Sequence, residues 1–355
     1  MDETVELLKR VTEAHGVPGY ETEVRAVLRE LMEPLGELSQ DKLGSLICRQ
    51  RGDGPKVMVA GHMDEIGFMA HHITDEGFIK FVQLGGWWDQ VLLGQRVLIK
   101  TRQGDVVGVI GAKPPHLLDA EERDKVVKKK DMFIDIGATS REEVEAAGVR
   151  LGDPIVPDSE FAVLANGKTY LSKAFDDRVG CALVVDVLRH FADGNEHPND
   201  LYGAATVMEE VGLRGATTSA RLVDPDVAII LESDIAGDVP GIKDEESHIK
   251  MGGGPTVLIY DTRMIPNLAL RDLVIDIAEE LEIPLQFSSI QGGATDGAAI
   301  HLHGTGVPTV VIAVAARHIH SHGAIIHRDD YDRARQLVQA LVGRLDQATV
   351  DSLTR

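Results

Sequence analysis

Four apolar segments rich in β-branched residues each run into side chains that can ligate a metal ion. The segments are residues 56–61, 203–208, 227–231 and 309–314. The side chains that follow them are His62 and Asp64, Glu209 and Glu210, Glu232 and Asp234, and His318, His320 and His322. Imidazole and carboxylate groups are ligands for zinc, cobalt and manganese. The chemistry expected of these residues is therefore metal-assisted.

Apolar runs of this length predict strands that are buried on both faces, as in a largely parallel sheet. Ligands of such sheets bind beyond the carboxyl ends of the strands, where these side chains would meet. So many carboxylates in one place repel one another unless cations lie among them. The pattern therefore predicts a metal site at one edge of an α/β sheet.

Glu209 and Glu210 form the most specific of these elements, because two adjacent glutamates at the end of a buried strand are uncommon. Neighbouring side chains there point in different directions, so one can bind a metal ion while the other stays free as a base. Glu232 likewise alternates in direction with Ser233, so only one of the acids Glu232 and Asp234 needs to face the site.

Three other elements have both a structural and a functional interpretation. Asp176 and Asp177 precede a predicted helix over 179–191, so they either cap that helix or provide a carboxylate between two metal ions. Asp64 either ligates directly or accepts the second N–H of His62. The three alternating histidines around His320 form either a chelating face or a histidine-rich surface loop.

Composition limits the partners of the chain. It has 355 residues, enough for two domains, and a formal net charge of −21. This charge argues against nucleic acids and anionic membranes, which both select basic surfaces. Cys48 and Cys181 are the two cysteines, and so few thiols indicate a reducing compartment. With no signal-peptide pattern and no apolar stretch near ~18 residues, we expect a cytoplasmic protein.

The pattern changes between residues 69 and 165, where the apolar runs are short and turns are frequent. This texture predicts a small all-β barrel or sandwich. Residues 1–68 and 166–355 have α/β character, so we interpret 69–165 as an insertion into one α/β domain. Within the insertion, residues 118–131 are dense in charge and predict a solvated loop.

Competing catalytic signatures are missing from the sequence. It has no Gly-x-Ser-x-Gly elbow of a serine hydrolase and no phosphate-binding Gly-x4-Gly-Lys-Ser/Thr loop. It also lacks the dinucleotide glycine spacing and the His-Glu-x-x-His helix of a zincin.

Taken in order, these elements resemble the M42 family of metallo-aminopeptidases, which includes tetrahedral and glutamyl aminopeptidase-like members formerly labelled cellulases. The motifs that carry the resemblance are residues 60–67, 174–178, 209–216 and 319–321, with residues 94–97 and 113–116 in the insertion. The resemblance covers nearly the whole chain. It implies a mainly parallel, zinc-exopeptidase-like catalytic domain with an inserted barrel-like dimerisation domain. It also implies self-assembly through dimers into a tetrahedral homododecamer.

The same resemblance implies a role for each site residue. The ligands would be His62 and Asp234 for one divalent ion, Glu210 and His320 for the other, and Asp176 between the two. The ions would be Zn²⁺, Co²⁺ or Mn²⁺. Glu209 would be the general base and Asp64 would orient His62, and the peptide bond after Asp176 would be cis. His318 departs from the tyrosine expected at that position.

The function we predict is metal-dependent release of N-terminal amino acids from short peptides. Two alternatives remain at this stage. One is a two-metal deacylase of N-acyl amino acids, and the other is a non-catalytic metal-binding assembly protein, which would not need a free Glu209. A glycosidase would use a carboxylate pair without an obligatory metal ion.

Overall fold

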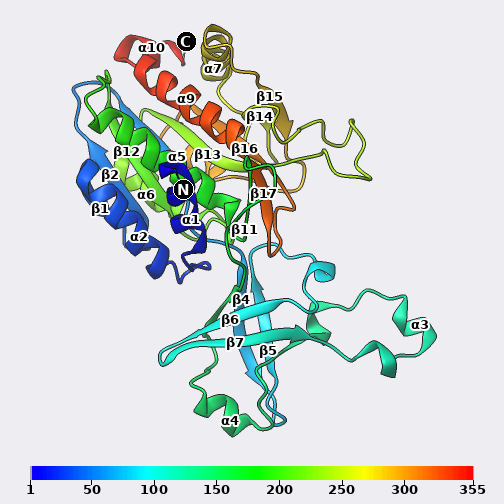
Figure 1. Ribbon diagram of the computed structural model, residues 1–355. Coiled ribbons are helices and arrows are strands. Elements are labelled where there is room, and N and C mark those ends of the chain that lie inside the picture. The colour runs from blue at the N-terminus through cyan, green and yellow to red at the C-terminus, as the bar shows by residue number, and fades with distance from the viewer. Residues whose placement is uncertain (1, 355) are drawn as a thin grey trace.

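A mixed eleven-stranded sheet forms the centre of the larger domain in the computed structural model, which describes residues 2–354 (Figure 1). In spatial order its main strands are β1 (Glu37–Gln40), β2 (Leu46–Gln50), β12 (Asp200–Thr206), β3 (Lys56–His62), β13 (Val227–Ile235), β16 (Thr309–Arg317), β17 (Ala324–His327), β11 (Thr169–Ser172) and β10 (Ala162–Val163). Two further strands, β14 (Thr256–Tyr260) and β15 (Gln286–Ser289), branch from β16.

The four apolar runs of the sequence become four adjacent strands. β12 pairs with β3, β3 with β13 and β13 with β16, in each case parallel. The prediction of a parallel centre is confirmed, and its reason is burial of both faces. Outside this centre, β2 and β17 pair antiparallel to their neighbours, so the complete sheet is mixed.

Helices cover both faces of the sheet because the strand side chains alternate. Ile229 and Leu231 of β13 belong to one core cluster, and Ala228 and Ile230 belong to another. Helices against the first cluster are α1 (Glu3–Glu13), α2 (Thr22–Met32), α5 (Phe175–Ala192), α7 (Leu268–Glu280), α9 (Arg328–Arg344) and α10 (Gln347–Ser352). Helices against the second are α6 (Arg214–Val223) and α8 (Gly297–Ile300). No helix within residues 2–354 is both long enough and apolar enough to cross a bilayer.

Six more strands within the described residues close into a barrel below the sheet (Figure 1). They are β4 (Gly67–Ile73), β5 (Ile79–Leu84), β8 (Phe133–Asp135), β7 (Gly104–Gly111), β6 (Arg96–Thr101) and β9 (Pro154–Pro157). Inward residues such as Phe68, Ile99 and Ile110 form a core of its own. The inserted β-barrel is therefore confirmed, since the chain enters it after β3 and leaves it before β10. The domain limits at 68/69 and 165/166 stay a prediction.

Two helices belong to the barrel, α4 (Arg141–Ala146) and α3 (Ala120–Arg123). The second lies in the charged segment 118–131, which extends away from the barrel in Figure 1. Asp119 begins this helix with a capping box, so part of the predicted loop is helical. The adjacent tryptophans differ, because Trp87 is buried in the barrel core whereas Trp88 is 61% exposed.

A buried ionic cluster secures the connection that leads from the larger domain into the barrel. Lys173 Nζ lies 2.5 Å from both carboxylate oxygens of Glu65, and Arg178 Nη2 lies 3.5 Å from Glu65 Oε1. Arg178 Nη1 also donates to the carbonyls of Val11 and Ala14 at the end of α1. The cluster therefore ties the β3–β4 connection, the start of α5 and the end of α1 to one another.

Replacing Glu65 by Gln should lower the free energy of unfolding by about 3–5 kcal/mol, because Lys173 and Arg178 would keep buried charges without a counter-charge. Urea unfolding followed by circular dichroism measures the change. Arg51→Gln is the matched control, since the Arg51–Glu37 pair is exposed and its loss should cost less than about 1 kcal/mol. Equal midpoints for the two variants would contradict the role of the cluster.

Candidate active site

The ligand-type residues meet at the edge where the four parallel strands end. His62 is the last residue of β3, and Glu232 lies in β13. Glu210 follows β12, and His320 follows β16. Asp176 lies in the first turn of α5, and its peptide bond to Asp177 is cis, as the resemblance implied. The convergence follows from the topology, because parallel strands share one carboxyl edge.

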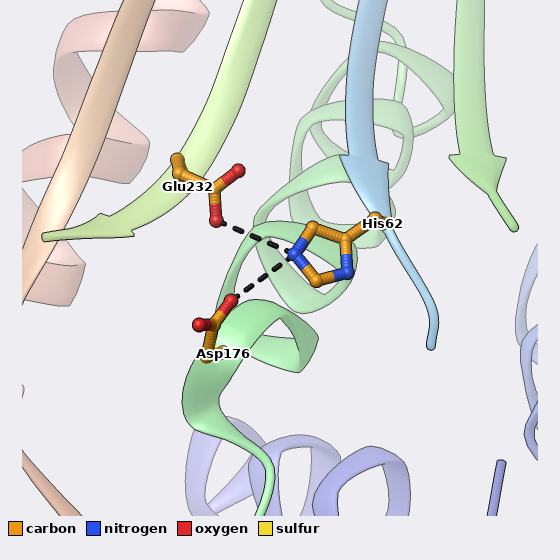
Figure 2. Close-up of side chains that lie close together, drawn as sticks. All are labelled: His62, Asp176 and Glu232. Carbon is orange, nitrogen blue, oxygen red and sulfur yellow. Dashed lines mark hydrogen bonds and ion pairs between the residues drawn. The ribbon is translucent and has the colours of Figure 1, made fainter. Parts of the chain in front are cut away.

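His62, Asp176 and Glu232 form the first group (Figure 2). His62 Nε2 lies 3.1 Å from Asp176 Oδ1 and 3.7 Å from Glu232 Oε1. The other ring nitrogen, Nδ1, lies 3.0 Å from the carbonyl oxygen of Asp64. A carbonyl only accepts hydrogen bonds, so Nδ1 carries a proton. Nε2 faces the carboxylates, to which it can donate when it is protonated, and its lone pair is available to a cation when it is not.

Asp176, Glu210 and His320 form the second group. His320 Nε2 lies 3.0 Å from Asp176 Oδ2 and 3.4 Å from Glu210 Oε1. His320 Nδ1 donates to the carbonyl of Gly86 at 2.7 Å, which gives His320 the same tautomer as His62. A Cβ at Gly86 would lie 3.0 Å from that nitrogen, so glycine gives the ring room. The Gly86 carbonyl was not foreseen from the sequence.

The two groups share Asp176. One of its carboxylate oxygens faces His62 and the other faces His320. Ligand atoms within each group lie within 4.8 Å of one another, which is the spacing that a single ion can bridge. Glu210 Oε1 is buried and accepts no hydrogen bond within the described residues. Closely spaced carboxylate and imidazole groups of this kind are suitable ligands for divalent cations.

Glu209 lies beside the first group and Glu210 in the second. Glu209 Oε2 is 3.9 Å from His62 Nε2, whereas Glu210 approaches His320. The carboxylate of Asp64 holds both residues, because Oδ1 accepts from the Glu209 amide and Oδ2 from the Glu210 amide. Asp64 therefore positions the glutamate pair with its side chain and contacts His62 mainly through its carbonyl.

The resemblance suggested Asp234 as the second ligand of the ion at His62, but Asp234 does not lie in either group. Glu232 lies beside His62 in its place. The parallel register explains the difference. Ile230 of β13 pairs with Ala60 of β3, so Glu232 is level with His62 and Asp234 lies beyond the end of β3. Asp234 Oδ1 accepts from the Ile235 amide instead.

Of the three clustered histidines, only His320 joins a group. His318 is exposed, and both His318 and His320 have positive φ angles, so the segment after β16 is a tight loop rather than a flat chelating face. His322 is buried, and neither of its ring nitrogens has a hydrogen-bond partner in the described residues.

Burial makes the carboxylates of the site hard to ionise unless positive charge lies beside them. Burial and the neighbouring Asp176 raise the pKa of Glu210 to about 8. Burial also raises the pKa of Glu209 and Glu232 well above the ordinary carboxylate range. Burial opposes a charge on His320, but the hydrogen bond to Asp176 raises its pKa to about 9. Divalent ions would replace these protons.

A cleft of about 980 Å³ opens over the two groups. Its walls include Arg263 and the glycine-rich segment 291–295. The site is therefore accessible to a ligand larger than water. Glu245 and Glu246 form part of the rim.

Comparison with known proteins agrees with this geometry. The family model described as M42 glutamyl aminopeptidase matches residues 44–337. The glutamyl aminopeptidase of Lactococcus lactis is 34% identical, over 98% of this chain and 98% of its own length. The lysyl aminopeptidase of Pyrococcus furiosus is 33% identical, over 96% of this chain and 97% of its own. The names of these two relatives refer to residues of opposite charge, glutamate in the first and lysine in the second.

Solved structures match over the whole fold. The TET aminopeptidase of a marine sediment Thaumarchaeota archaeon has a TM-score of 0.97 and 52% identity, and the match covers 99% of each chain. The TET1 peptidase of Pyrococcus horikoshii, which can assemble into a tetrahedron or a large octahedral shell, has a TM-score of 0.86 and 32% identity, with 97% of this chain and 100% of that chain covered. With this fold, site and family match, the chain belongs to the M42 family of metal-dependent aminopeptidases.

Proposed function

We propose that this aminopeptidase binds two divalent cations and uses Glu209 as the general base to release the first residue of short peptides. The observation that carries the proposal is the carboxylate of Asp176, whose oxygens lie 3.1 Å from His62 Nε2 and 3.0 Å from His320 Nε2. A carboxylate placed in this way can serve two ions at once. His62 and Glu232 would complete one ion site, and Glu210 and His320 the other.

The donor set suits Zn²⁺, Co²⁺ or Mn²⁺, because each proposed ion site combines one imidazole with carboxylates. When bound, such ions polarise a scissile carbonyl, acidify a bound water and stabilise the developing oxyanion. The fixed Nδ1–H tautomers of His62 and His320 keep both Nε2 atoms aimed at the ion positions.

Glu209 is the acid–base group in this proposal. The attacking water gives a proton to Glu209, and the water oxygen forms a bond to the carbonyl carbon. Glu209 then donates that proton to the nitrogen of the leaving amine as the C–N bond breaks. Asp64 supports this role, since its carboxylate holds the Glu209 amide at 2.9 Å.

Assembly and location extend the proposal. By analogy with the tetrahedral TET1 peptidase of Pyrococcus horikoshii, we propose that this chain forms dimers through the barrel and then a homododecamer. Exposed apolar residues on the barrel, Val107 and Val109 among them, support a contact surface there. An enclosed assembly admits only short or unfolded peptides. A cytoplasmic location stays a prediction of the sequence.

Glu209→Gln should lower kcat by roughly 10²–10⁴-fold, because the amide cannot take a proton from water. Metal content, measured by plasma mass spectrometry, should stay at the wild-type value. Glu160→Gln, an exposed acid in the β9–β10 connection, is the control and should keep both properties. Full turnover in Glu209→Gln would remove Glu209 as the base.

Metal content also separates the two acids of β13. Glu232→Gln should weaken metal binding by at least about tenfold, whereas Asp234→Asn should bind metal nearly as the wild type does. Asp176→Ala should lose more metal than either variant, since both proposed ion sites share its carboxylate. Titration with zinc against a competing chelator measures the three affinities. Loss of metal in Asp234→Asn alone would return the ligand role to Asp234.

The metal-free protein should lose stability as pH rises from about 4.5 to 9. Glu210 and His320 keep protons in the folded state up to pKa values of about 8 and 9, above their ordinary values of 4.5 and 6.5. The unfolded chain therefore releases these protons first, and each lowers the free energy of unfolding by up to about 1.4 kcal/mol per pH unit. Glu209 and Glu232 act in the same direction.

Thermal unfolding of the chelator-treated protein at several pH values tests this slope. Glu210→Gln should flatten the profile, and added zinc should stabilise the wild type more at pH 8 than at pH 6. A metal-free protein that becomes more stable across this range would contradict the assignment.

A further inference from the structure

A second hollow of about 650 Å³ lies beside the main cleft, between the barrel and the loop after β16. We name it the barrel-side pocket, and its walls are Gly86, Trp88, Gln90, Val91, Leu93 and Gln95 from the barrel and residues 318–323 from the loop. Gly86, Ile319 and His320 also line the main cleft. The two hollows therefore meet at the proposed metal ligand His320.

The two hollows differ in the acidic side chains that line them. The main cleft is lined by acids, namely Asp176, Glu209, Glu210, Glu232, Glu245 and Glu246. The barrel-side pocket has no acid among its lining residues and presents the imidazoles of His318, His320 and His322. A peptide has a cationic amine at one end and an anionic carboxylate at the other. Its amino end therefore suits the acidic cleft, and its carboxyl end meets no lining carboxylate that would repel it in the barrel-side pocket.

His322 is built into this pocket without a partner of its own. Its side chain is 8% exposed, and neither ring nitrogen makes a hydrogen bond within residues 2–354. The ring packs against Trp87 with centroids 5.1 Å apart, so its position is fixed by the barrel core. Buried polar groups are nearly always hydrogen-bonded. A peptide group or a carboxylate of a ligand would supply the hydrogen-bond partner that this ring lacks.

An apolar surface lies in the same pocket. Trp88 is 61% exposed and Leu93 is 42% exposed, although both belong to residue types that are usually buried. Trp87, the preceding residue in the chain, is buried and stacks on Phe68 at 4.8 Å, so the backbone that carries Trp88 is anchored in the barrel core. Such a surface fits an apolar or aromatic side chain.

We propose that the barrel-side pocket binds the leaving side of the substrate. The side chain of the second residue packs on Trp88 and Leu93. The following peptide group, or the terminal carboxylate of a dipeptide, hydrogen-bonds to His322 and approaches His318. The preferred substrates are then dipeptides and short peptides with an apolar or aromatic second residue. This assignment rests on the proposed function, because it takes the scissile bond to lie at His320.

Substrates that differ only beyond the scissile bond test the pocket. With the first residue held constant, we would compare the aminoacyl amide, the dipeptide ending in glycine and the dipeptide ending in phenylalanine. Trp88→Ala should lower the ratio of kcat/KM for the phenylalanine dipeptide over the glycine dipeptide by roughly tenfold. Trp88 is exposed, so this variant keeps the fold.

His322→Phe is the matched change for the imidazole, since it keeps a ring against Trp87 and removes both nitrogens. The ratio of kcat/KM for the glycine dipeptide over the amide should fall by roughly tenfold, while Glu160→Gln keeps the wild-type ratios. As a binding readout, the inactive Glu209→Gln variant should change its tryptophan emission with the phenylalanine dipeptide and not with the amide.

The outcomes separate this proposal from the proposed function. If the metal-loaded wild type hydrolyses no amide and no peptide, the proposed function fails. If it hydrolyses them normally but Trp88→Ala and His322→Phe both keep the wild-type ratios, the barrel-side pocket is not the leaving-side subsite.

Discussion

Repulsion among buried carboxylates is the constraint on which the site depends. Asp176, Glu209, Glu210 and Glu232 converge at one sheet edge, where their side chains are mostly buried. In such surroundings a set of acids must take up protons, meet cations or move apart. The fold holds them together, because Glu232 lies in β13, Asp176 lies in the first turn of α5, and the Asp64 carboxylate holds the amides of the glutamate pair that follows β12. The fold therefore favours positive charge at this edge, which either protons or metal ions can supply.

The inserted barrel is part of this site rather than an appendage. The carbonyl of Gly86, in the connection that follows β5, fixes the ring of His320. The ionic cluster of Glu65, Lys173 and Arg178 secures the chain where it passes from β3 into the barrel. A movement of the barrel against the sheet would therefore alter a proposed ligand directly. This coupling links the barrel to the candidate site through a few named contacts.

Much of this arrangement was predictable from the sequence, and the limits have physical causes. The four central strands were predictable because uninterrupted apolar runs require burial on both faces. The convergence of His62, Glu210 and His320 followed, because parallel strands end at one edge. The choice between Glu232 and Asp234 was not predictable, since both lie on one face of β13. Only the register with β3 determines which of the two is level with His62. Gly86 was also missed, because a backbone carbonyl has no signature in the side-chain pattern.

Asp64 shows why the positioning residues differ in kind from the proposed ligands. Its carboxylate is buried, yet each oxygen accepts a backbone N–H from the glutamate pair. The same residue turns its carbonyl to His62 Nδ1. Both oxygens of the Asp64 carboxylate are therefore satisfied by hydrogen bonds within the protein. Glu210 lacks such donors at Oε1 and stays available to an ion. Full hydrogen bonding thus separates the acids that build the site from those that are free to bind metal.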